Sequence, residues 1–150
     1  MVQVRDLTSA DAAAIAAWRY PDGYSTYDVT DSSDLASDHW AVTDGEELVG
    51  YCCFGAPARV AGAEPEPGTL DVGYGMRPQL MGLGHGAGFV AAVLEFARRR
   101  HDPQRLRLYV LDWNERSRTV AAAHGFAVVA ALDGDEDGER YLVMVRRDRA

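Results

Sequence analysis

The sequence contains no lysine, and all 15 of its basic residues are arginine. Between Tyr20 and Ala58 it has no arginine either, although eight acidic residues fall there. The other 15 acidic residues balance the 15 arginines, so this acidic block carries the whole net charge of −8. Such a charge argues against a nucleic-acid partner and favours a cationic small molecule or basic peptide; a solvated surface that serves solubility is the alternative. The acidic block consists of Asp22, Asp28, Asp31, Asp34, Asp38, Asp44, Glu46 and Glu47.

Cysteine and long apolar runs are also scarce. Cys52 and Cys53 are the two cysteines, and as neighbours in a strand-like segment they point to opposite faces and do not pair. No run approaches the roughly 18 apolar residues of a membrane helix, and the first residues do not resemble a signal peptide. A length of 150 residues predicts a single domain, residues 1–150. We expect a reduced, cytoplasmic protein with no membrane partner.

The most informative stretch runs from Leu70 to Arg100. An alternating apolar run up to Met76 predicts a strand, which Arg77-Pro78 ends. An amphipathic segment from Phe89 onward predicts a helix. Glycines between them allow a tight turn whose N–H groups converge on an anion in front of the helix, so the stretch predicts a phosphate-binding loop; a merely flexible loop is the alternative. These glycines are Gly82, Gly84, Gly86 and Gly88.

Alternating and helical periodicity predict the other elements. The polar stretch 24–38 is irregular with one short helix, and hairpins turn at Asp44-Gly45 and at Asp133 to Glu139. The expected helices run from Thr8 or Ser9 to Arg19 and from Asn114 to His124, and the expected strands are Val2–Arg5, His39–Thr43, Glu47–Phe54, Arg105–Leu111, Phe126–Leu132 and Arg140–Arg146.

This order of elements, with two motifs, resembles the GNAT superfamily of acyl-CoA-dependent N-acetyltransferases over nearly the whole chain. The segment from Pro78 to Gly86, PQLMGLGHG, resembles the family's pyrophosphate loop, P-x-x-[QR]-G-x-G-x-[GA]. Asn114, followed by Gly125-Phe126, resembles its N-x-x-A-x-x-x-Y-x-x-x-G-F helix. The resemblance implies an α/β (mixed α+β) fold: a central mixed, mostly antiparallel sheet of about six to seven strands with helices on both faces.

The resemblance also implies acetyl-CoA as cosubstrate and no metal. It places Asn114 on the pantetheine arm, although Asn is equally a good helix N-cap. Tyr24 and Tyr27 fall in a segment similar to the family's acceptor-site wall, beside the acidic block, and are expected to line the amine pocket. Because family members often dimerise through their C-terminal strands, a homodimer is expected. The residues expected at the cofactor are Met76, Arg77, Met81, Gly82, Leu83, Gly84, His85, Gly86 and Asn114.

The sequence departs from the family pattern at two positions, one in the pyrophosphate loop and one at the usual general acid. Met81 replaces the usual Gln or Arg, although Gln79 satisfies a shifted register. Ala121 stands where many members have a Tyr that protonates the departing thiolate, so the family's usual general acid is missing. A backbone N–H near Met76 is expected to stabilise the oxyanion.

A general base is needed more than an acid, because an alkylamine is mostly protonated at pH 7. Asp71 is one candidate, with an Asp that faces solvent or pairs with Arg77 as the alternative. Asp112 is the other candidate, unless it only begins the next turn. His124, in the last turn of its helix, is expected to be structural.

We therefore expect an N-acetyltransferase that moves an acetyl group from acetyl-CoA to a primary amine by direct attack. Two alternatives remain. A non-catalytic acyl-CoA sensor fits the missing Tyr, and a dinucleotide-binding protein fits the G-x-G-x-x-A match that begins at Gly82. The acidic run from Asp133 to Gly138 matches half of a calcium-binding loop, but Met144 occupies the position of its final Glu, so an acidic turn is expected.

Overall fold

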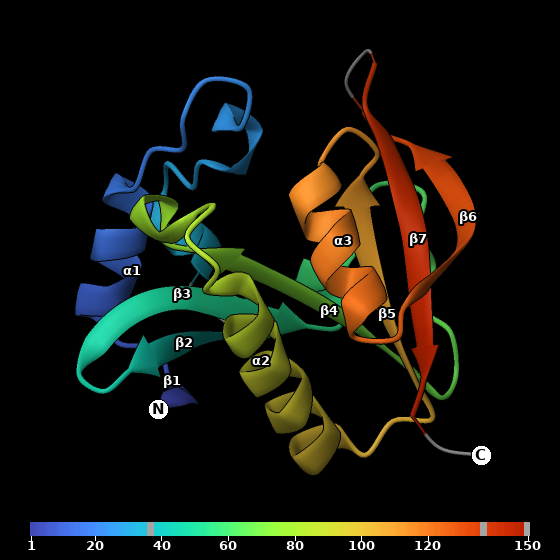
Figure 1. Ribbon diagram of the computed structural model, residues 1–150, viewed down its shortest axis with the longest axis horizontal. Coiled ribbons are helices and arrows are strands. Elements are labelled where there is room, and N and C mark those ends of the chain that lie inside the picture. Colours follow the sequence, from blue (N-terminus) through green and yellow to red (C-terminus); the bar gives the residue numbers. More distant parts are fainter. Residues whose placement is uncertain (36–37, 136–137, 149–150) are drawn as a thin grey trace. The chain divides into compact units, whose positions relative to one another are not determined.

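The computed structural model describes residues 1–35, 38–135 and 138–148. Seven strands pair in the order β1-β2-β3-β4-β5-β7-β6 (Figure 1). β4 and β5 are parallel, whereas β1–β2, β2–β3, β5–β7 and β6–β7 are antiparallel. This mixed, mostly antiparallel sheet confirms the expected fold class. The elements are β1 (Val2–Asp6), α1 (Ser9–Ala17), β2 (His39–Asp44), β3 (Glu47–Phe54), β4 (Thr69–Met76), α2 (Gly86–His101), β5 (Arg105–Leu111), α3 (Glu115–Ala123), β6 (Ala127–Asp133) and β7 (Arg140–Arg147).

The chain divides into two units. The first contains Met1–Cys53 and Tyr74–Val93, and the second contains Phe54–Gly73 and Leu94–Ala150. β4 and α2 therefore contribute residues to both units.

The first unit has a small core beneath α1. Ile15 and Leu35 are buried there, and Trp18 and Tyr51 pack against them. Gly50 of β3 is buried because the ring of Phe89 occupies the place of a side chain: a Cβ there would lie 2.3 Å from Phe89 Cε2. Close packing against α2 therefore requires glycine at this position.

A capping box begins α1. The Thr8 hydroxyl accepts the N–H of Asp11 at 3.1 Å, and the Asp11 carboxylate accepts the N–H of Thr8 at 2.9 Å. Arg5 also donates to both carboxylate oxygens, at 2.6 and 3.2 Å. The hydrogen bond from Arg5 is the main cause that lowers the pKa of Asp11 to about 2. The first turn thus joins the helix to β1.

We expect Thr8→Ala to lower the free energy of unfolding by about 1 kcal/mol, because it removes an N-cap acceptor. Urea denaturation measures the change. The matched control is Ser9→Ala, which alters an exposed hydroxyl one residue later and is expected to change stability by less than about 0.5 kcal/mol. Equal losses in both variants would contradict the capping role.

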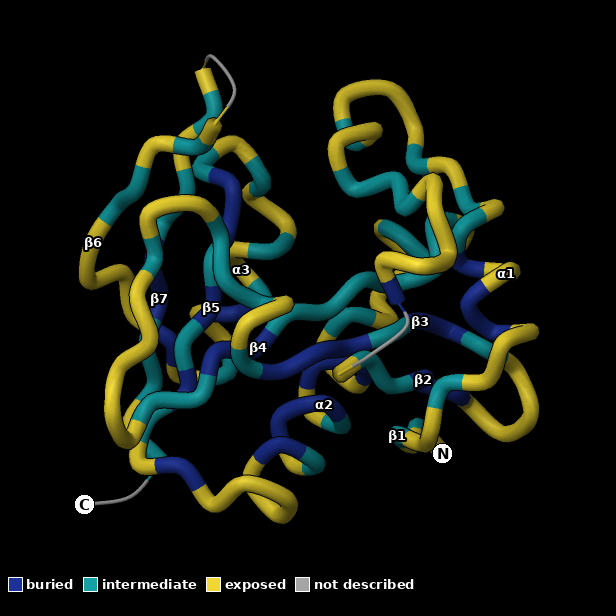
Figure 2. The backbone as a smooth tube through the Cα atoms, turned by 180° about the vertical axis from the view of Figure 1, so that it is seen from behind, coloured by how far each residue is buried: buried dark blue, intermediate teal, exposed yellow. Residues whose placement is uncertain are grey.

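The second unit is built on β5. Its residues alternate, with Leu106, Leu108 and Val110 buried and the intervening side chains half-buried (Figure 2). Leu111, at the end of the strand, is buried too. β6 is different, because Val128 and Val129 are 51% and 62% exposed on a strand that ends the sheet.

Several element boundaries differ from the sequence expectation. α1 ends at Ala17, two residues before the expected Arg19. The guanidinium of Arg19 donates hydrogen bonds to the carbonyls of Ala16 and Trp18. α2 begins at Gly86, so Gly86 and Gly88 belong to its first turn and not to the loop. In place of one short helix, the polar stretch has 3₁₀ turns at Ser25–Tyr27 and Ser32–Leu35.

Other expectations hold. Asn114 and His124 are the caps of α3, and Gly125 follows with a φ of 89°. Cys52 and Cys53 are both buried, and no disulfide joins them. The two expected hairpins pair as β2–β3 and β6–β7, although residues 136–137 of the acidic turn, and residues 36–37 of the polar stretch, lie outside the described residues.

Candidate active site

The glycine loop joins β4 to α2 in the first unit. A 3₁₀ turn at Pro78–Leu80 leads to Met81, and Gly82 and Gly84 then adopt φ values of 73° and 84°. Glycine adopts such positive φ values at a lower steric cost than residues with a Cβ, which explains glycine at these two positions. The first N–H groups of α2 have no acceptor within the helix, and they follow directly after the loop. This arrangement suits an anion such as a pyrophosphate.

Side chains of the loop contribute little to its shape. Leu83 is 65% exposed, and His85 is exposed as well. The carbonyl of His85 accepts the N–H of Phe89 at 3.1 Å, which begins the helical bonding of α2. The roles of Met81, Leu83 and His85 at the cofactor stay predictions that depend mainly on their backbone groups.

Arg77 is held by β3. Its backbone N–H donates to the carbonyl of Val49 at 2.8 Å, and its guanidinium pairs with Glu47 and donates to the carbonyl of Leu48. The expected alternative, in which Arg77 pairs with Asp71, is therefore wrong. The contacts of Arg77 fix the end of β4, and a direct contact with the cofactor stays a prediction.

Tyr20, which the sequence did not single out, contacts the end of β4. Its hydroxyl donates to the carbonyl of Met76 at 2.6 Å, between residues 56 positions apart. Its backbone N–H donates to Oδ1 of Asp28 at 2.8 Å. Burial raises the pKa of Tyr20, as do nearby acidic groups, so the hydroxyl remains a donor. No periodicity or motif in the sequence marks this residue.

Tyr24 and Tyr27 lie in the same aromatic group as Tyr20. The rings of Tyr20 and Tyr27 meet edge to face with centroids 6.1 Å apart, and those of Tyr24 and Tyr27 are 6.4 Å apart. All three are half-buried, and they belong to the part of the chain that carries the acidic block. Their role in binding the amine stays a prediction.

Asp71 lies in the second unit and is only 1% exposed. Arg107 donates to its carboxylate at 2.6 and 3.0 Å, Arg59 at 3.0 Å, and the Tyr109 hydroxyl at 2.9 Å. Burial alone would raise the pKa of Asp71, but these hydrogen bonds outweigh it and lower the pKa. The alternative of an Asp that faces solvent is wrong. These contacts make Asp71 a poor proton acceptor and give it a structural role.

Asp112 follows β5 directly. Its N–H donates to the carbonyl of Arg140 at 2.9 Å, and its carbonyl accepts from Arg118 at 3.0 Å. These bonds hold the backbone of Asp112 at the turn into α3, so it does begin that turn. A role for its half-buried carboxylate as the base stays a prediction.

The α3 motif has mainly structural contacts. Oδ1 of Asn114 accepts the N–H of Ser117 at 3.2 Å, so the N-cap role is present, and its role at the pantetheine arm stays a prediction. Ala121 is fully buried, so the position of the family's Tyr lies inside this unit. Nδ1 of His124 contacts the carbonyl of Val120 at 2.8 Å, which fits the expected structural role.

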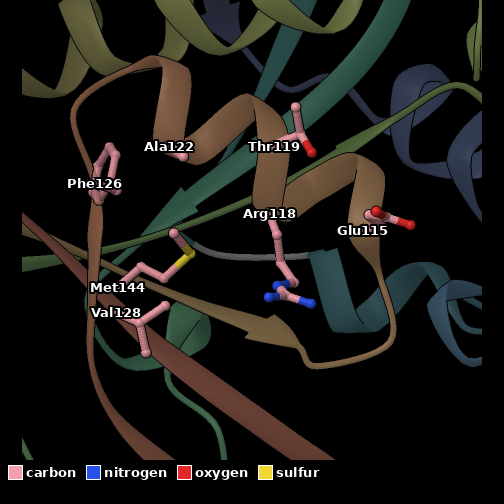
Figure 3. Close-up of a pocket in the computed structure, with 7 residues that line it drawn as sticks. All are labelled: Glu115, Arg118, Thr119, Ala122, Phe126, Val128 and Met144. Atoms are coloured by element: carbon pink, nitrogen blue, oxygen red, sulfur yellow. The ribbon is translucent and has the colours of Figure 1, made fainter.

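One cavity of about 360 Å³ lies between α3 and the strands β6 and β7 (Figure 3). Phe126 and Met144 form the buried apolar portion of its lining, and Arg118 lines its polar side. None of the expected site residues lines it, so it adds nothing to the expected site. Its lining residues are Glu115, Arg118, Thr119, Ala122, Phe126, Val128 and Met144.

Two absences hold for the described part of the chain. No three His, Cys, Asp or Glu side chains within it are grouped so that they could hold a metal ion. Among the same residues, no helix has the length and apolar character needed to cross a membrane.

Comparison with solved structures identifies similar folds. Aminoglycoside acetyltransferase AAC(6')-Ib in complex with ribostamycin and coenzyme A is 17% identical, with a TM-score of 0.77 and coverage of 97% of this chain and 93% of that one. A putative phosphinothricin N-acetyltransferase is 16% identical, with a TM-score of 0.76 and full coverage of both chains. A chimera of the spermidine N-acetyltransferase SpeG from Vibrio cholerae and hSSAT is 13% identical, with a TM-score of 0.76 and coverage of 97% and 95%.

Sequence comparison identifies the family of this chain. A search of curated protein sequences finds no match. The profile of the family described as "Acetyltransferase (GNAT) domain" matches residues 2–127, which is most of the chain. The dinucleotide-binding alternative is thereby discarded. This chain belongs to the GNAT acetyltransferase family.

Proposed function

We propose that this protein transfers an acetyl group from acetyl-CoA to a primary amine by direct attack of the amine on the thioester. The observation that carries the proposal is the strand–loop–helix unit of β4 and α2, in which Gly82 and Gly84 are left-handed and the N-terminus of α2 follows. In a chain of the GNAT family, this unit is suited to the pyrophosphate of acetyl-CoA. The cofactor supplies the activated acetyl group, and the chain binds and orients it.

The N–H of Met76 is our proposed donor to the acetyl carbonyl. Attack on the thioester places negative charge on this oxygen, and a fixed backbone donor stabilises that charge. The thiol of CoA has a pKa near 8.5, so its thiolate leaves at neutral pH without a strong acid. The replacement of the family's Tyr by Ala121 is therefore compatible with turnover.

Removal of the amine proton is the harder step. At pH 7 an alkylamine with a pKa of about 10.4 must lose a proton at a cost of about 4–5 kcal/mol. Asp112 is our candidate for the group that accepts it, directly or through water. Asp71, the other candidate, is engaged by two arginines and a tyrosine, so its contacts support a structural role instead.

The acceptor we propose is a cationic amine. The acidic block lies in the first unit together with Tyr24 and Tyr27, and its charge attracts cations by long-range electrostatics. The similar structures include an aminoglycoside acetyltransferase in complex with ribostamycin or kanamycin, and a chimera of a spermidine N-acetyltransferase. Ribostamycin, kanamycin and spermidine are all amines. These compounds, with phosphinothricin, form the first panel to test.

Calorimetric titration with acetyl-CoA tests the proposal, with NADH as control. We expect acetyl-CoA to bind with a micromolar dissociation constant, NADH not to bind, and at least one amine of the panel to cause release of the CoA thiol. Binding without thiol release for any amine would favour the acyl-CoA sensor, for which the buried Ala121 is the supporting observation. No binding would contradict both functions.

Three broader expectations complete the proposal. A reducing, cytoplasmic compartment suits Cys52 and Cys53, which are not joined by a disulfide. The net charge of −8 argues against nucleic acid as a partner. The exposed Val128 and Val129 on the end strand β6 support a homodimer through the C-terminal strands.

A further inference from the structure

The backbone at the end of β4 has a definite direction. The N–H of Arg77 points to β3, where it donates to Val49. The carbonyl of Gly75 faces β3 as well, because a Cβ on Gly50 would lie 2.5 Å from it. In a strand, the N–H and C=O of one residue point to one edge and those of the next residue to the other. The N–H and C=O of Met76 therefore point together to the edge away from β3.

The sequence at this end of β4 also leaves the backbone many allowed conformations. Gly73 and Gly75 flank Tyr74, just before Met76, and glycines lose more conformational freedom on folding than any other residue. Gly75 cannot be replaced without a change in packing, because a Cβ there would lie 2.6 Å from the ring of Tyr51. The direction of the Met76 backbone thus depends on contacts from outside β4.

Tyr20 supplies such a contact. Its hydroxyl donates to the Met76 carbonyl at 2.6 Å, on the same edge as the Met76 N–H. Tyr20 is itself fixed at two points: its N–H is bonded to Asp28, and its ring meets Tyr27 edge to face. The peptide that follows Met76 is thereby held on both sides, by Tyr20 at its carbonyl and by Val49 at its N–H.

We propose that Tyr20 is a positioning residue for acetyl transfer: its hydroxyl holds the Met76 carbonyl and so fixes the direction of the Met76 N–H toward the acetyl carbonyl. The inference rests on the proposed function, in which that N–H stabilises the oxyanion. Tyr20 acts through Met76 and exchanges no proton with the substrate. A well-directed donor stabilises the transition state more than a mobile one, because no reorganisation is needed when charge develops.

Infrared difference spectroscopy of acetyl-CoA labelled with ¹³C at the carbonyl tests this role without knowledge of the acceptor. In the wild-type protein, we expect the bound thioester carbonyl to absorb at lower frequency than free acetyl-CoA, because it accepts a hydrogen bond. Tyr20→Phe keeps the ring and its contact with Tyr27 but removes the donor. We expect this variant to lose most of the frequency shift, while its affinity for acetyl-CoA changes by less than about threefold, because the glycine loop is untouched.

Two further proteins make the outcome decisive. Tyr141→Phe removes a hydroxyl from half-buried Tyr141 of β7 and is expected to keep the full shift. 3-Fluorotyrosine at position 20 keeps the ring and the hydroxyl and makes the hydroxyl a stronger hydrogen-bond donor. We therefore expect a frequency shift at least as large as that of the wild type. This measurement tests the role of Tyr20 even if Tyr20→Phe does not fold. An unchanged shift in Tyr20→Phe, or a lost shift with fluorotyrosine, would overturn the role of Tyr20 and leave the proposed function standing. Failure of the wild type to bind acetyl-CoA would overturn the proposed function with it.

Discussion

Gly84→Asp is expected to weaken acetyl-CoA binding about 100-fold. The substitution places a carboxylate in the loop that we propose holds the pyrophosphate. Two like charges about 5 Å apart repel each other by about 3 kcal/mol at an effective dielectric constant of about 20, and each 1.4 kcal/mol is about tenfold in affinity. Space is not the reason for the loss, because a Cβ on Gly84 would contact nothing within 4 Å. Isothermal titration with acetyl-CoA measures the effect.

The chain offers a closely matched control for this experiment. Gly62 has a φ of 83°, against 84° for Gly84, and a Cβ there also meets nothing within 4 Å. Gly62→Asp therefore introduces the same charge and the same backbone strain outside the glycine loop. We expect it to bind acetyl-CoA like the wild type. If both variants lose affinity equally, the loss comes from strain or net charge, and the loop is not the pyrophosphate site.

Asp71→Asn is expected to lower the free energy of unfolding by about 3 kcal/mol. Removal of one partner from a buried ion pair leaves the other charge uncompensated, which costs about 3–5 kcal/mol, and Asn retains one acceptor, which favours the lower value. The charges left behind are Arg59 and Arg107, whose side chains are only 22% and 12% exposed. Urea denaturation measures the loss. Glu95→Gln, which breaks exposed pairs with Arg98 and Arg99, is the control and should cost less than about 1 kcal/mol.

The pH dependence of this difference follows from the lowered pKa of Asp71. A carboxyl whose pKa is lower in the folded protein stabilises it fully above the ordinary pKa of Asp, about 3.9, and this contribution is lost as the pH falls through the folded value. The difference between wild type and Asp71→Asn should thus be constant at neutral pH and shrink below about pH 4. A difference that instead grows on acidification would contradict the assigned contacts.

Turnover of the same variant separates the two roles considered for Asp71. Loss of a general base costs about 10²–10⁴-fold in rate, whereas loss of a structural carboxylate leaves the folded molecules active. We expect the rate per folded molecule to fall by less than about tenfold. A fall of about 100-fold or more without loss of stability would restore Asp71 as the catalytic base.

Local patterns in the sequence were sufficient to predict most of the helices and strands. The alternation from Arg105 to Leu111 predicted β5 with its observed bounds, because one face of that strand is buried. Asn114 and Gly125 marked the ends of α3 because caps depend on neighbouring residues alone. The expectation of a GNAT acetyltransferase is confirmed by the family match. The role of each glycine was ambiguous, since Gly86 and Gly88 were expected in the loop but belong to the first turn of α2.

Contacts between distant residues depended on the tertiary structure alone. Tyr20 meets Met76 across 56 positions, and Asp71 meets Arg107 and Tyr109 across 36 and 38. Periodicity reports which face of an element is buried, but it carries no information on which side chain from another element reaches that face. The sequence by itself therefore determined the elements, the glycine loop and the family. Only the folded chain decided that Asp71 is a buried ion-pair partner and that Tyr20 holds the end of β4, because both depend on pairing through space.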